Sequence, residues 1–454
     1  MSVVRGLYSV AVWLAQPLLR RKLARRAVVE PGYGVAVEER FGHYSVPSDT
    51  GRVWIHAVSL GETRAAAILL ARLREQAPGL RLLLTHGTAT GRAEGEKLLR
   101  PGDVQVWQPW DTPGAVQRFL AHFQPCIGIL METELWPNLT AACAAHGMPL
   151  VLANARLNER SFVKTLRMDW LARPAYRALA VVWAQTEADA MRLRALGAPV
   201  QGVFGNLKFD ATPDAAPLEK GRAWRAALGR PVVLFASSRE GEEAEFLKEI
   251  CTSPGVKRSQ SAMDIEASAR CESVQWLIVP RHPQRFDAVA ALITQQGFAV
   301  SRRSSWGNQP AQTVAADATL GPDAGREGVG PVIWLGDSLG EMALYYGLAD
   351  VALLGGSFAP LGGQNLIEAA ACGCPVVMGP HTFNFAEAAE LALAAGAAQA
   401  VPDMATGLVV ARALAADPAR QQAAARDAQV FASAHRGAAA RTAEAVLSLL
   451  RRST

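Results

Sequence analysis

The sequence predicts an α/β protein with two parallel sheets, each belonging to a Rossmann-like domain. Short apolar runs, each long enough for one buried strand, alternate along the chain with segments of helical period. The alternation pauses once, at residues 206–217, where Asp, Pro and Ala replace the apolar runs. Because strands that alternate with helices form parallel sheets covered on both faces, we expect two such domains, joined at this pause and facing one ligand cleft.

The strands and helices are expected in the following places. The first half has seven apolar runs, at 52–57, 80–85, 104–108, 126–131, 149–153, 180–185 and 200–205, with helical segments at 63–76, 112–123, 135–146 and 187–196. The second half has five runs, at 231–237, 276–280, 332–336, 351–355 and 375–378, and ends in an Ala/Arg-rich helical stretch from about 418 to 451. Two polar segments without periodicity, 252–273 and 303–330, are expected to be surface insertions or flexible loops.

These elements predict a division of the chain into four parts. Residues 27–210 form an N-terminal Rossmann-like domain, and residues 211–425 form a C-terminal one that carries both insertions. Residues 426–454 form a helix that packs back on the N-terminal domain. Residues 1–26 form a separate N-terminal helix.

The N-terminal segment has the composition of a membrane-associated helix. Residues 6–19 are apolar and nearly uncharged, and five basic residues follow, Arg20, Arg21, Lys22, Arg25 and Arg26. The run is short for a bilayer span, and no small-x-small cleavage site follows it. Basic residues after the apolar run favour a cytoplasmic location for the rest of the chain. We expect an anchor or an interfacial helix on an anionic leaflet, with a soluble helix packed on the body as the alternative.

The overall composition limits the classes of molecule that the protein is expected to bind. The net charge of +5 fits an anionic partner such as a nucleotide, a phosphorylated lipid or a membrane surface. Nucleic acid is disfavoured because the basic residues form no aromatic-interleaved stripe. The six cysteines are scattered through mostly apolar segments, which indicates reduced thiols in a cytosolic setting, and no metal site is expected.

Charged residues follow several strands of the first domain. Glu62 comes after the strand 52–57 and the small residues 59–61, where an open sheet places an acid at its ligand crevice. It can act as a general base, or stabilise the N-terminus of a helix. Glu132 and Glu134 follow the strand 126–131; Glu132 is nearer to the strand end and is preferred for the cleft, while one of the pair can instead cap the next helix. Lys208 lies at the domain junction, either reaching an anion across the cleft or solvated in a hinge.

The turn at 85–91 is open to two interpretations. Its hydroxyl residues and glycines between a strand and a helix can form an anion cradle of backbone N–H groups, or only a capped turn. His86 within it is more often a hydrogen-bonded structural residue than a ligand contact.

Five strand-end motifs of the second domain, rich in Gly, Ser, Arg and Glu, together indicate a nucleotide site; they lie at 236–242, 280–283, 335–341, 355–358 and 362–368. Arg281 is a candidate for bidentate phosphate binding, and Asn365 at a helix start can offer donors to a phosphate. Glu341 or Glu368 can accept hydrogen bonds from ribose hydroxyls, with a buried Arg–Glu pair as the alternative for each. The sequence has no Asp-x-Asp, no Walker motif and no Gly-x-Gly-x-x-Gly opening a first βαβ unit, which disfavours a metal-chelated nucleotide, a kinase and a dehydrogenase.

Taken in order, these motifs resemble the 3-deoxy-D-manno-octulosonic acid (Kdo) transferases of lipid A assembly. The resemblance is carried by WIHAVSLGE at 54–62, ETELWPN at 132–138, GNLKFD at 205–210, PRHP at 280–283, GDSLGE at 336–341, GGQNLIE at 362–368 and GPHTFNF at 379–385. It implies the GT-B fold, CMP-Kdo as donor, a lipid IVA-type acceptor, no cofactor and no metal. The two insertions depart from the family pattern.

The resemblance also implies roles for individual residues and a location. Glu62 is the base, and Glu132 and Lys208 assist at the transition state. CMP contacts are implied for Pro280, Arg281, Leu339, Gly340, Glu341, Asn365, Leu366, Ile367 and Glu368. The location is the cytoplasmic face of the cell inner membrane. The number of Kdo residues transferred stays open.

Two alternatives remain. One is another GT-B enzyme, such as a sialyl- or N-acetylglucosaminyltransferase or a nucleotide-sugar epimerase. The other is an exported two-domain solute-binding protein, which the absence of a cleavage site and the unpaired cysteines oppose.

Overall fold

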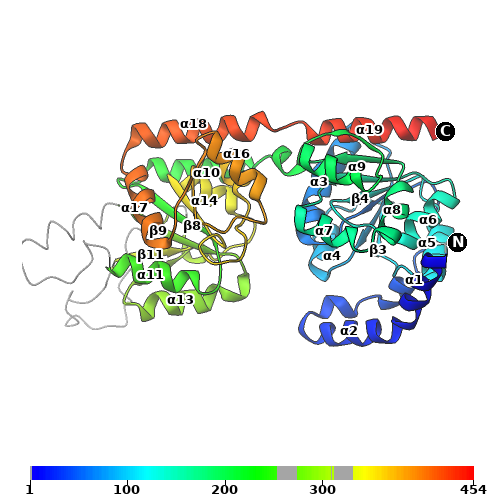
Figure 1. Cartoon of the computed structure of the whole chain (residues 1–454). Helices are drawn as coiled ribbons and strands as arrows, with labels where there is room; N and C mark the ends of the chain where they lie inside the picture. The colour runs from blue at the N-terminus through cyan, green and yellow to red at the C-terminus, as the bar shows by residue number, and fades with distance from the viewer. Residues whose placement is uncertain (1–2, 253–273, 308, 311–330, 454) are drawn as a thin grey trace, which may run out of the picture. The chain divides into compact units, whose positions relative to one another are not determined.

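The chain forms two compact units (Figure 1). The structure is a computed structural model, and it describes residues 3–252, 274–307, 309–310 and 331–453. Unit 1 comprises Met1–Asp210 and His435–Thr454, and unit 2 comprises Ala211–Ala434. The chain therefore leaves unit 1 after Asp210, where the sequence places the junction.

The return to unit 1 differs from the expectation. It comes between Ala434 and His435 and not between residues 425 and 426, because the C-terminal stretch is two helices, α18 (Pro418–Ala434) in unit 2 and α19 (Ala438–Ser453) in unit 1. The carboxylate of Asp210 holds the start of α19 by accepting the N–H groups of Gly437 and Ala439, at 2.5 and 2.6 Å. Only α19 packs back on the first domain.

Unit 1 is built on a seven-stranded parallel sheet. Its strand order is β3-β2-β1-β4-β5-β6-β7, so the chain reverses direction across the sheet between β1 and β4. The strands are β1 Val53–His56, β2 Leu82–His86, β3 Val104–Trp107, β4 Ile127–Met131, β5 Leu150–Ala155, β6 Val181–Ala184 and β7 Val200–Val203. In open sheets of this kind, ligands bind outside the carboxyl ends of the strands at such a reversal.

Helices cover both faces of this sheet because successive strand residues point to opposite sides. Val53 and Ile55 of β1 pack in a core with α3 and α19, whereas Trp54 packs in a second core with α5, α6 and α9. The helices of unit 1 other than α19 are α1 Val3–Leu14, α2 Gln16–Val29, α3 Leu60–Gln76, α4 Ala89–Glu96, α5 Pro113–Phe123, α6 Pro137–Ala145, α7 Glu159–Leu166, α8 Asp169–Arg177 and α9 Glu187–Ala195.

The N-terminal segment is two helices and not the single helix expected over residues 1–26. The first ends at Leu14, and Pro17 lies in the first turn of the second, where its missing N–H leaves no bond unmade. Within the described ranges, none of the helices combines the length and hydrophobicity that a bilayer crossing requires.

Unit 2 has a second parallel sheet of seven strands, in the order β10-β11-β9-β8-β12-β13-β14, which reverses between β8 and β12. The strands are β8 Val232–Ser238, β9 Gln275–Pro280, β10 Ala299–Arg302, β11 Val332–Leu335, β12 Val351–Leu354, β13 Val376–Met378 and β14 Ala398–Ala400. The helices other than α18 are α10 Ala215–Ala226, α11 Glu242–Thr252, α13 Phe286–Gln295, α14 Met342–Leu348, α15 Leu366–Ala371, α16 Ala386–Ala394 and α17 Met404–Ala415.

Two strands of unit 2 are absent from the sequence prediction. Strands β10 and β14 are the two edges of the sheet, and each has only four or three residues, some of them partly exposed. Edge strands need no continuous apolar run, so the sequence signal is weak there. Most of the two predicted insertions, namely 253–273, 308 and 311–330, lies outside the described residues.

Candidate active site

Glu62 stands at the reversal of the first sheet, in the first turn of α3 directly after β1. The hydroxyl of Ser59 accepts the N–H of Glu62 at 3.4 Å and donates to the Glu62 carboxylate at 2.9 Å. The other carboxylate oxygen accepts the N–H of Val58 at 2.8 Å. These contacts fix both the start of the helix and the orientation of the acid; they differ from a capping box in that the reciprocal backbone bond comes from Val58 and not from the N-cap Ser59. Gly61 beside it is exposed, and an added Cβ would meet only the Ser59 hydroxyl, at 4.0 Å, so one approach to the carboxylate stays open.

The environment of Glu62 makes it a stronger base than an ordinary glutamate. Burial raises the pKa of Glu62 from 4.5 to about 7. The negative charges of Glu132 and Glu134 contribute to this increase in the pKa of Glu62, whereas the hydrogen bonds from Val58 and Ser59 oppose it. A carboxylate that titrates near neutral pH is suited to take a proton from a substrate hydroxyl.

Glu132 follows β4, the other strand at the reversal. Its backbone is left-handed, with φ at +59°, which is uncommon for any residue except glycine and is found often at functional sites. Two backbone bonds hold this conformation: its N–H donates to Ala153 at 3.1 Å, and its carbonyl accepts from Arg156 at 3.2 Å. The structure thus places Glu62 and Glu132 at the ends of adjacent strands.

Lys208 joins this pair from a segment 76 residues beyond Glu132. Its ammonium group lies 3.0 Å from the Glu132 carboxylate, and the two side chains are only 22% and 16% exposed. The short helix Leu207–Asp210 that carries the lysine is held by Asn154, whose side-chain oxygen accepts the N–H of Leu207 at 3.0 Å. The three residues named for catalysis therefore belong to one region of unit 1, with Lys208 in an ion pair with Glu132.

Glu134, which the sequence favours less than Glu132 for the cleft, also acts on this site. Its charge contributes to the raised pKa of Glu62, and burial raises the pKa of Glu134 itself. It does not cap α6; Asp111 does, by accepting the N–H groups of Asn138 and Leu139 at 2.9 and 2.8 Å. The Glu-x-Glu spacing is the signal that could have placed both acids in the site.

The turn at 85–91 is a capped turn. The N–H groups of Gly87 and Thr88 donate to Val58, and the Thr88 hydroxyl accepts the N–H of Gly91 at 3.2 Å, so these donors are not available for an anion. His86 is fully buried between the carbonyl of Ala57, at 2.9 Å, and Gln105, at 3.1 Å. Burial lowers the pKa of His86 to about 4, which fits a neutral structural histidine.

The residues named for donor binding all follow the carboxyl ends of strands in unit 2. Pro280 ends β9 and Arg281 follows it, residues 339–341 follow β11, and residues 365–368 follow β12 at the start of α15. Because β11, β9, β8 and β12 are neighbours in one parallel sheet, these segments share one edge of it.

This edge is electropositive near Pro280. The positive charges of Arg239, Arg281 and Arg285 act on His282, and together with burial, the larger cause, they lower its pKa. The backbone N–H of Arg281 donates to Ser238 at 3.0 Å, which ties its segment to the end of β8. Arg285 is paired with the carboxylate of Glu243 at 2.6 Å, so the suitability of this edge for an anionic ligand depends mainly on Arg239 and Arg281.

Residues of the segments 339–341 and 365–368 form hydrogen bonds and an ion pair within unit 2. The carboxylate of Glu341 pairs with Arg303 at 2.8 Å and accepts the Ser338 hydroxyl at 2.5 Å, which is the Arg–Glu pair considered as the alternative for this residue. Leu339 is 74% exposed, and Gly340 adopts a left-handed conformation at φ +79°. Asn365 is the N-cap of α15, accepting the N–H of Ile367 at 3.2 Å.

The residues that follow Asn365 in the segment 365–368 differ in exposure. Leu366 and Ile367 are buried, so any contact they make with a ligand is through the backbone, whereas Glu368 is partly exposed in the first turn of the helix. In the described part of the chain, no three His, Cys, Asp or Glu side chains gather in a way that would hold a metal ion.

Solved structures with the same arrangement define the class of fold. A UDP-GlcNAc 2-epimerase from Neisseria meningitidis aligns with a TM-score of 0.55 at 14% identity, over 87% of this chain and 100% of its own. A glycosyltransferase from Rickettsia africae aligns with a TM-score of 0.52 at 13% identity, over 89% and 98%. With two parallel-sheet α/β units and these neighbours, the protein has a GT-B fold.

Sequence relatives identify the family. The family model described as 3-Deoxy-D-manno-octulosonic-acid transferase (kdotransferase) matches residues 36–211. A 3-deoxy-D-manno-octulosonic acid transferase from Bordetella pertussis is 44% identical over 97% of this chain and 98% of its own length, and one from Haemophilus influenzae is 32% identical over 84% of each. The chain belongs to the 3-deoxy-D-manno-octulosonic acid transferase family. It is therefore an enzyme, a glycosyltransferase, and not a solute-binding protein.

Proposed function

We propose that the protein transfers Kdo from CMP-Kdo to a lipid A precursor of the lipid IVA type, in lipopolysaccharide core biosynthesis. The observation that carries the proposal is Glu62, a half-buried acid with a pKa of about 7 at the reversal of the first sheet, beside the Glu132–Lys208 ion pair. Membership of the Kdo transferase family supports the choice of sugar.

In the proposed reaction Glu62 is the general base. The acceptor hydroxyl gives its proton to the Glu62 carboxylate as its oxygen attacks the anomeric carbon of the donor sugar. The bond from that carbon to the phosphate oxygen breaks, and CMP leaves as an anion with the bonding electron pair. Since CMP is a stable anion on departure, the reaction needs no general acid.

Glu132 and Lys208 are proposed to assist at the transition state. The lysine brings a positive charge to a partly buried site, where charges interact more strongly than in water. Its ion pair with Glu132 fixes the position of the ammonium group. The donor contacts are proposed for residues 280–281, 339–341 and 365–368, with the guanidinium group of Arg281 on the phosphate.

The test is a transfer assay read by mass spectrometry. CMP-Kdo generated in situ and a tetraacylated lipid A precursor are incubated with the wild type, with Glu62→Gln and with Glu187→Gln. Glu187 is a matched control, since it also lies in the first turn of a helix of unit 1, but its side chain is 75% exposed. We expect transfer by the wild type and by the control, loss of transfer by Glu62→Gln, and a product mass that counts the sugars added. No transfer by the wild type would reject the donor or the acceptor.

We further propose that α1 and α2 hold the protein on the cytoplasmic face of the inner membrane. On α1 the buried side is polar: Ser9 donates to Asn138 at 3.0 Å, and Tyr8 hydrogen-bonds to Asp111. The outward side is apolar, with Val3, Leu7, Val10, Trp13 and Leu14 between 55% and 81% exposed. A helix that turns its apolar stripe to solvent is suited to lie in a bilayer interface.

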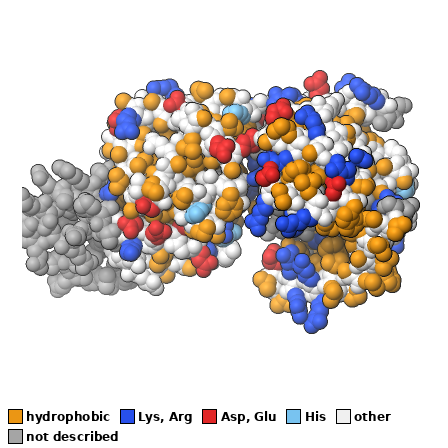
Figure 2. Space-filling model, in the orientation of Figure 1, with side chains coloured by type: hydrophobic (Ala, Val, Ile, Leu, Met, Phe, Trp, Pro, Cys, Tyr) orange, Lys and Arg blue, Asp and Glu red, His pale blue; other side chains and the backbone are white. Residues whose placement is uncertain are grey.

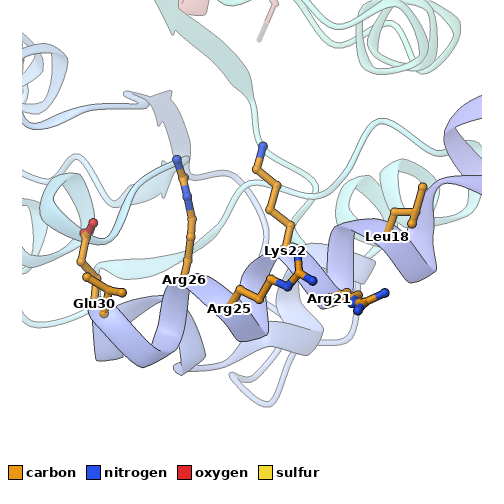
Figure 3. A pocket seen from close by; sticks show the side chains of 7 residues that line it. Leu18, Arg21, Lys22, Arg25, Arg26 and Glu30 are labelled. Carbon is orange, nitrogen blue, oxygen red and sulfur yellow. The ribbon is translucent and has the colours of Figure 1, made fainter.

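The second helix adds positive charge to this surface. Figure 2 shows hydrophobic and basic side chains gathered over the α1–α2 segment. Four basic residues of α2, Arg21, Lys22, Arg25 and Arg26, line a cavity of about 490 Å³ (Figure 3). Basic side chains beside an apolar stripe favour a leaflet with anionic lipids.

Vesicle sedimentation tests this location. We expect the wild type to sediment with vesicles that contain anionic phosphatidylglycerol, and to do so less at high salt. Trp13→Asp, which places a charge in the apolar stripe, is expected to remain in the supernatant, while Val430→Asp, at an equally exposed apolar position of unit 2, binds as the wild type does. Equal binding by Trp13→Asp would contradict the proposal.

A further inference from the structure

We propose that Glu242 is a positioning residue for the donor site, which holds the two loops at the reversal of the second sheet in the geometry that binds the CMP group. The inference rests on the proposed function, because it takes the strand ends of unit 2 as the donor site. Glu242 itself is 1% exposed and is not proposed to touch the substrate.

The carboxylate of Glu242 joins two loops through four backbone N–H groups. One oxygen accepts from Arg239 at 2.9 Å and from Gly356 at 2.8 Å. The other accepts from Phe358 at 3.2 Å and from Ala359 at 3.1 Å. The first donor lies in the loop after β8 and the other three lie in the loop after β12, so one buried side chain binds both segments at the point where the sheet reverses.

The end of β8 and the start of the loop after β12 approach each other more closely than a side chain would allow. A Cβ added to Gly355 would lie 2.2 Å from the carbonyl oxygen of Ser237. Ser237 itself is held at φ +55°, in the left-handed region. Strained backbone of this kind persists only where the surroundings fix it, and the bonds to Glu242 lie directly beside it.

The loop after β12 continues into residues named for donor binding. The carbonyl of Gly356 accepts the N–H of Gly363 at 2.7 Å, and Asn365 follows two residues later at the start of α15. A shift of the 356–359 backbone therefore moves the segment that carries Asn365.

The neighbouring acid, Glu243, serves the other side of the same edge. Its fully buried carboxylate binds Arg285 through both oxygens, at 2.6 and 3.1 Å, and accepts the hydroxyl of Ser238 at 2.8 Å. The carbonyl of Ser238 also accepts the N–H of Arg281. The first turn of α11 is therefore connected to the loops that follow β9 and β12, the two strands on either side of β8.

Replacing Glu242 with Gln removes part of this arrangement without changing the size of the side chain. A carboxamide keeps one accepting oxygen, and its NH2 group must face two backbone N–H donors that it cannot accept from. Since hydrogen bonds to a buried carboxylate are among the stronger ones, the loops are expected to separate at that point.

The experiment measures CMP binding by calorimetry and the KM for CMP-Kdo on the full-length protein. For Glu242→Gln we expect CMP binding weakened by about tenfold or more, a KM for the donor raised by a similar factor, and a KM for the acceptor left unchanged. The matched control is Asp350→Asn. Asp350 is also a mostly buried carboxylate of unit 2 that accepts a backbone N–H, from Val232 at 2.7 Å, but it lies at the opposite ends of the strands, before β12. It is expected to lower thermal stability with no change in CMP binding.

A second variant covers the case in which Glu242→Gln does not fold. Glu242→Asp keeps the charge and shortens the side chain by about 1.5 Å, one C–C bond. Weakened CMP binding by this variant would support the same conclusion. Wild-type affinity for CMP in a folded variant of Glu242 would overturn the positioning role and leave the proposed function intact. A wild type that does not bind CMP would overturn the proposed donor, and this inference with it.

Discussion

The raised pKa of Glu62 makes a quantitative prediction about pH. If Glu62 is the base and its pKa is about 7, only its ionised fraction is active. That fraction is about one-tenth at pH 6, half at pH 7 and nine-tenths at pH 8, so kcat/KM for transfer is expected to rise about tenfold from pH 6 to pH 8. The Glu187→Gln control is expected to show the same profile.

The same pKa has a consequence for stability with a definite sign. A pKa raised from 4.5 to about 7 means that the folded state binds this proton more tightly than the unfolded state. The free energy of unfolding therefore falls as the pH rises from 4.5 to 7, by at most about 3.5 kcal/mol, since one pKa unit corresponds to about 1.4 kcal/mol. Glu62→Gln lacks this titration and is expected to gain stability relative to the wild type between pH 5 and pH 8.

Two measurements check this reasoning. Initial rates across pH 5.5–8.5 give the kinetic midpoint. Urea unfolding at pH 5 and at pH 8 gives the difference in the free energy of unfolding between the wild type and Glu62→Gln. Taking that difference cancels the buried histidines, His56 and His86, whose pKa values burial lowers. A rate that stays constant across this pH range, as an ordinary glutamate with a pKa near 4.5 would give, or a constant difference in stability between the two proteins, would refute the assignment of a raised pKa to Glu62.

Two further predictions concern other contacts. Lys208→Met is expected to lower kcat about 100-fold, because the site loses a partly buried positive charge. It is also expected to move the kinetic midpoint to higher pH, because the charge of Glu132 is no longer compensated; an unchanged profile would argue against the ion pair. Gly221→Ala is expected to destabilise unit 2 by about 2 kcal/mol in thermal unfolding, because its Cβ would lie 2.1 Å from the carbonyl oxygen of Leu344 where α10 crosses α14. Gly229→Ala, which has open space, is the control expected to be near neutral, and equal stability of the two variants would contradict the close crossing.

The fold is readable from the sequence wherever a strand is buried on both faces. Strands β1–β9 and β11–β13 coincide with the predicted apolar runs. For the central strands the reason is that the middle of a covered parallel sheet excludes polar side chains. Strands β3 and β7 are edges of the first sheet and only partly buried, yet they keep enough apolar residues to be predicted. The edge strands β10 and β14 lack that constraint. The sequence predicts one helix across the break between α1 and α2, because the apolar composition continues through the break, although Pro17 marks the start of the second helix.

The sequence by itself also determined which side chains meet at the carboxyl edges of the sheets. Glu62 and Glu132 follow strands, and parallel strands end at one edge, so their proximity follows from chain order and topology. Tertiary structure alone decided how these groups behave. The pKa of Glu62 depends on burial and on acids from another loop, the ion pair depends on a lysine 76 residues beyond Glu132, and the role of Glu242 depends on N–H groups more than 100 residues away. Electrostatic and hydrogen-bond energies depend on distance and burial in space, and those quantities exist only in the folded chain.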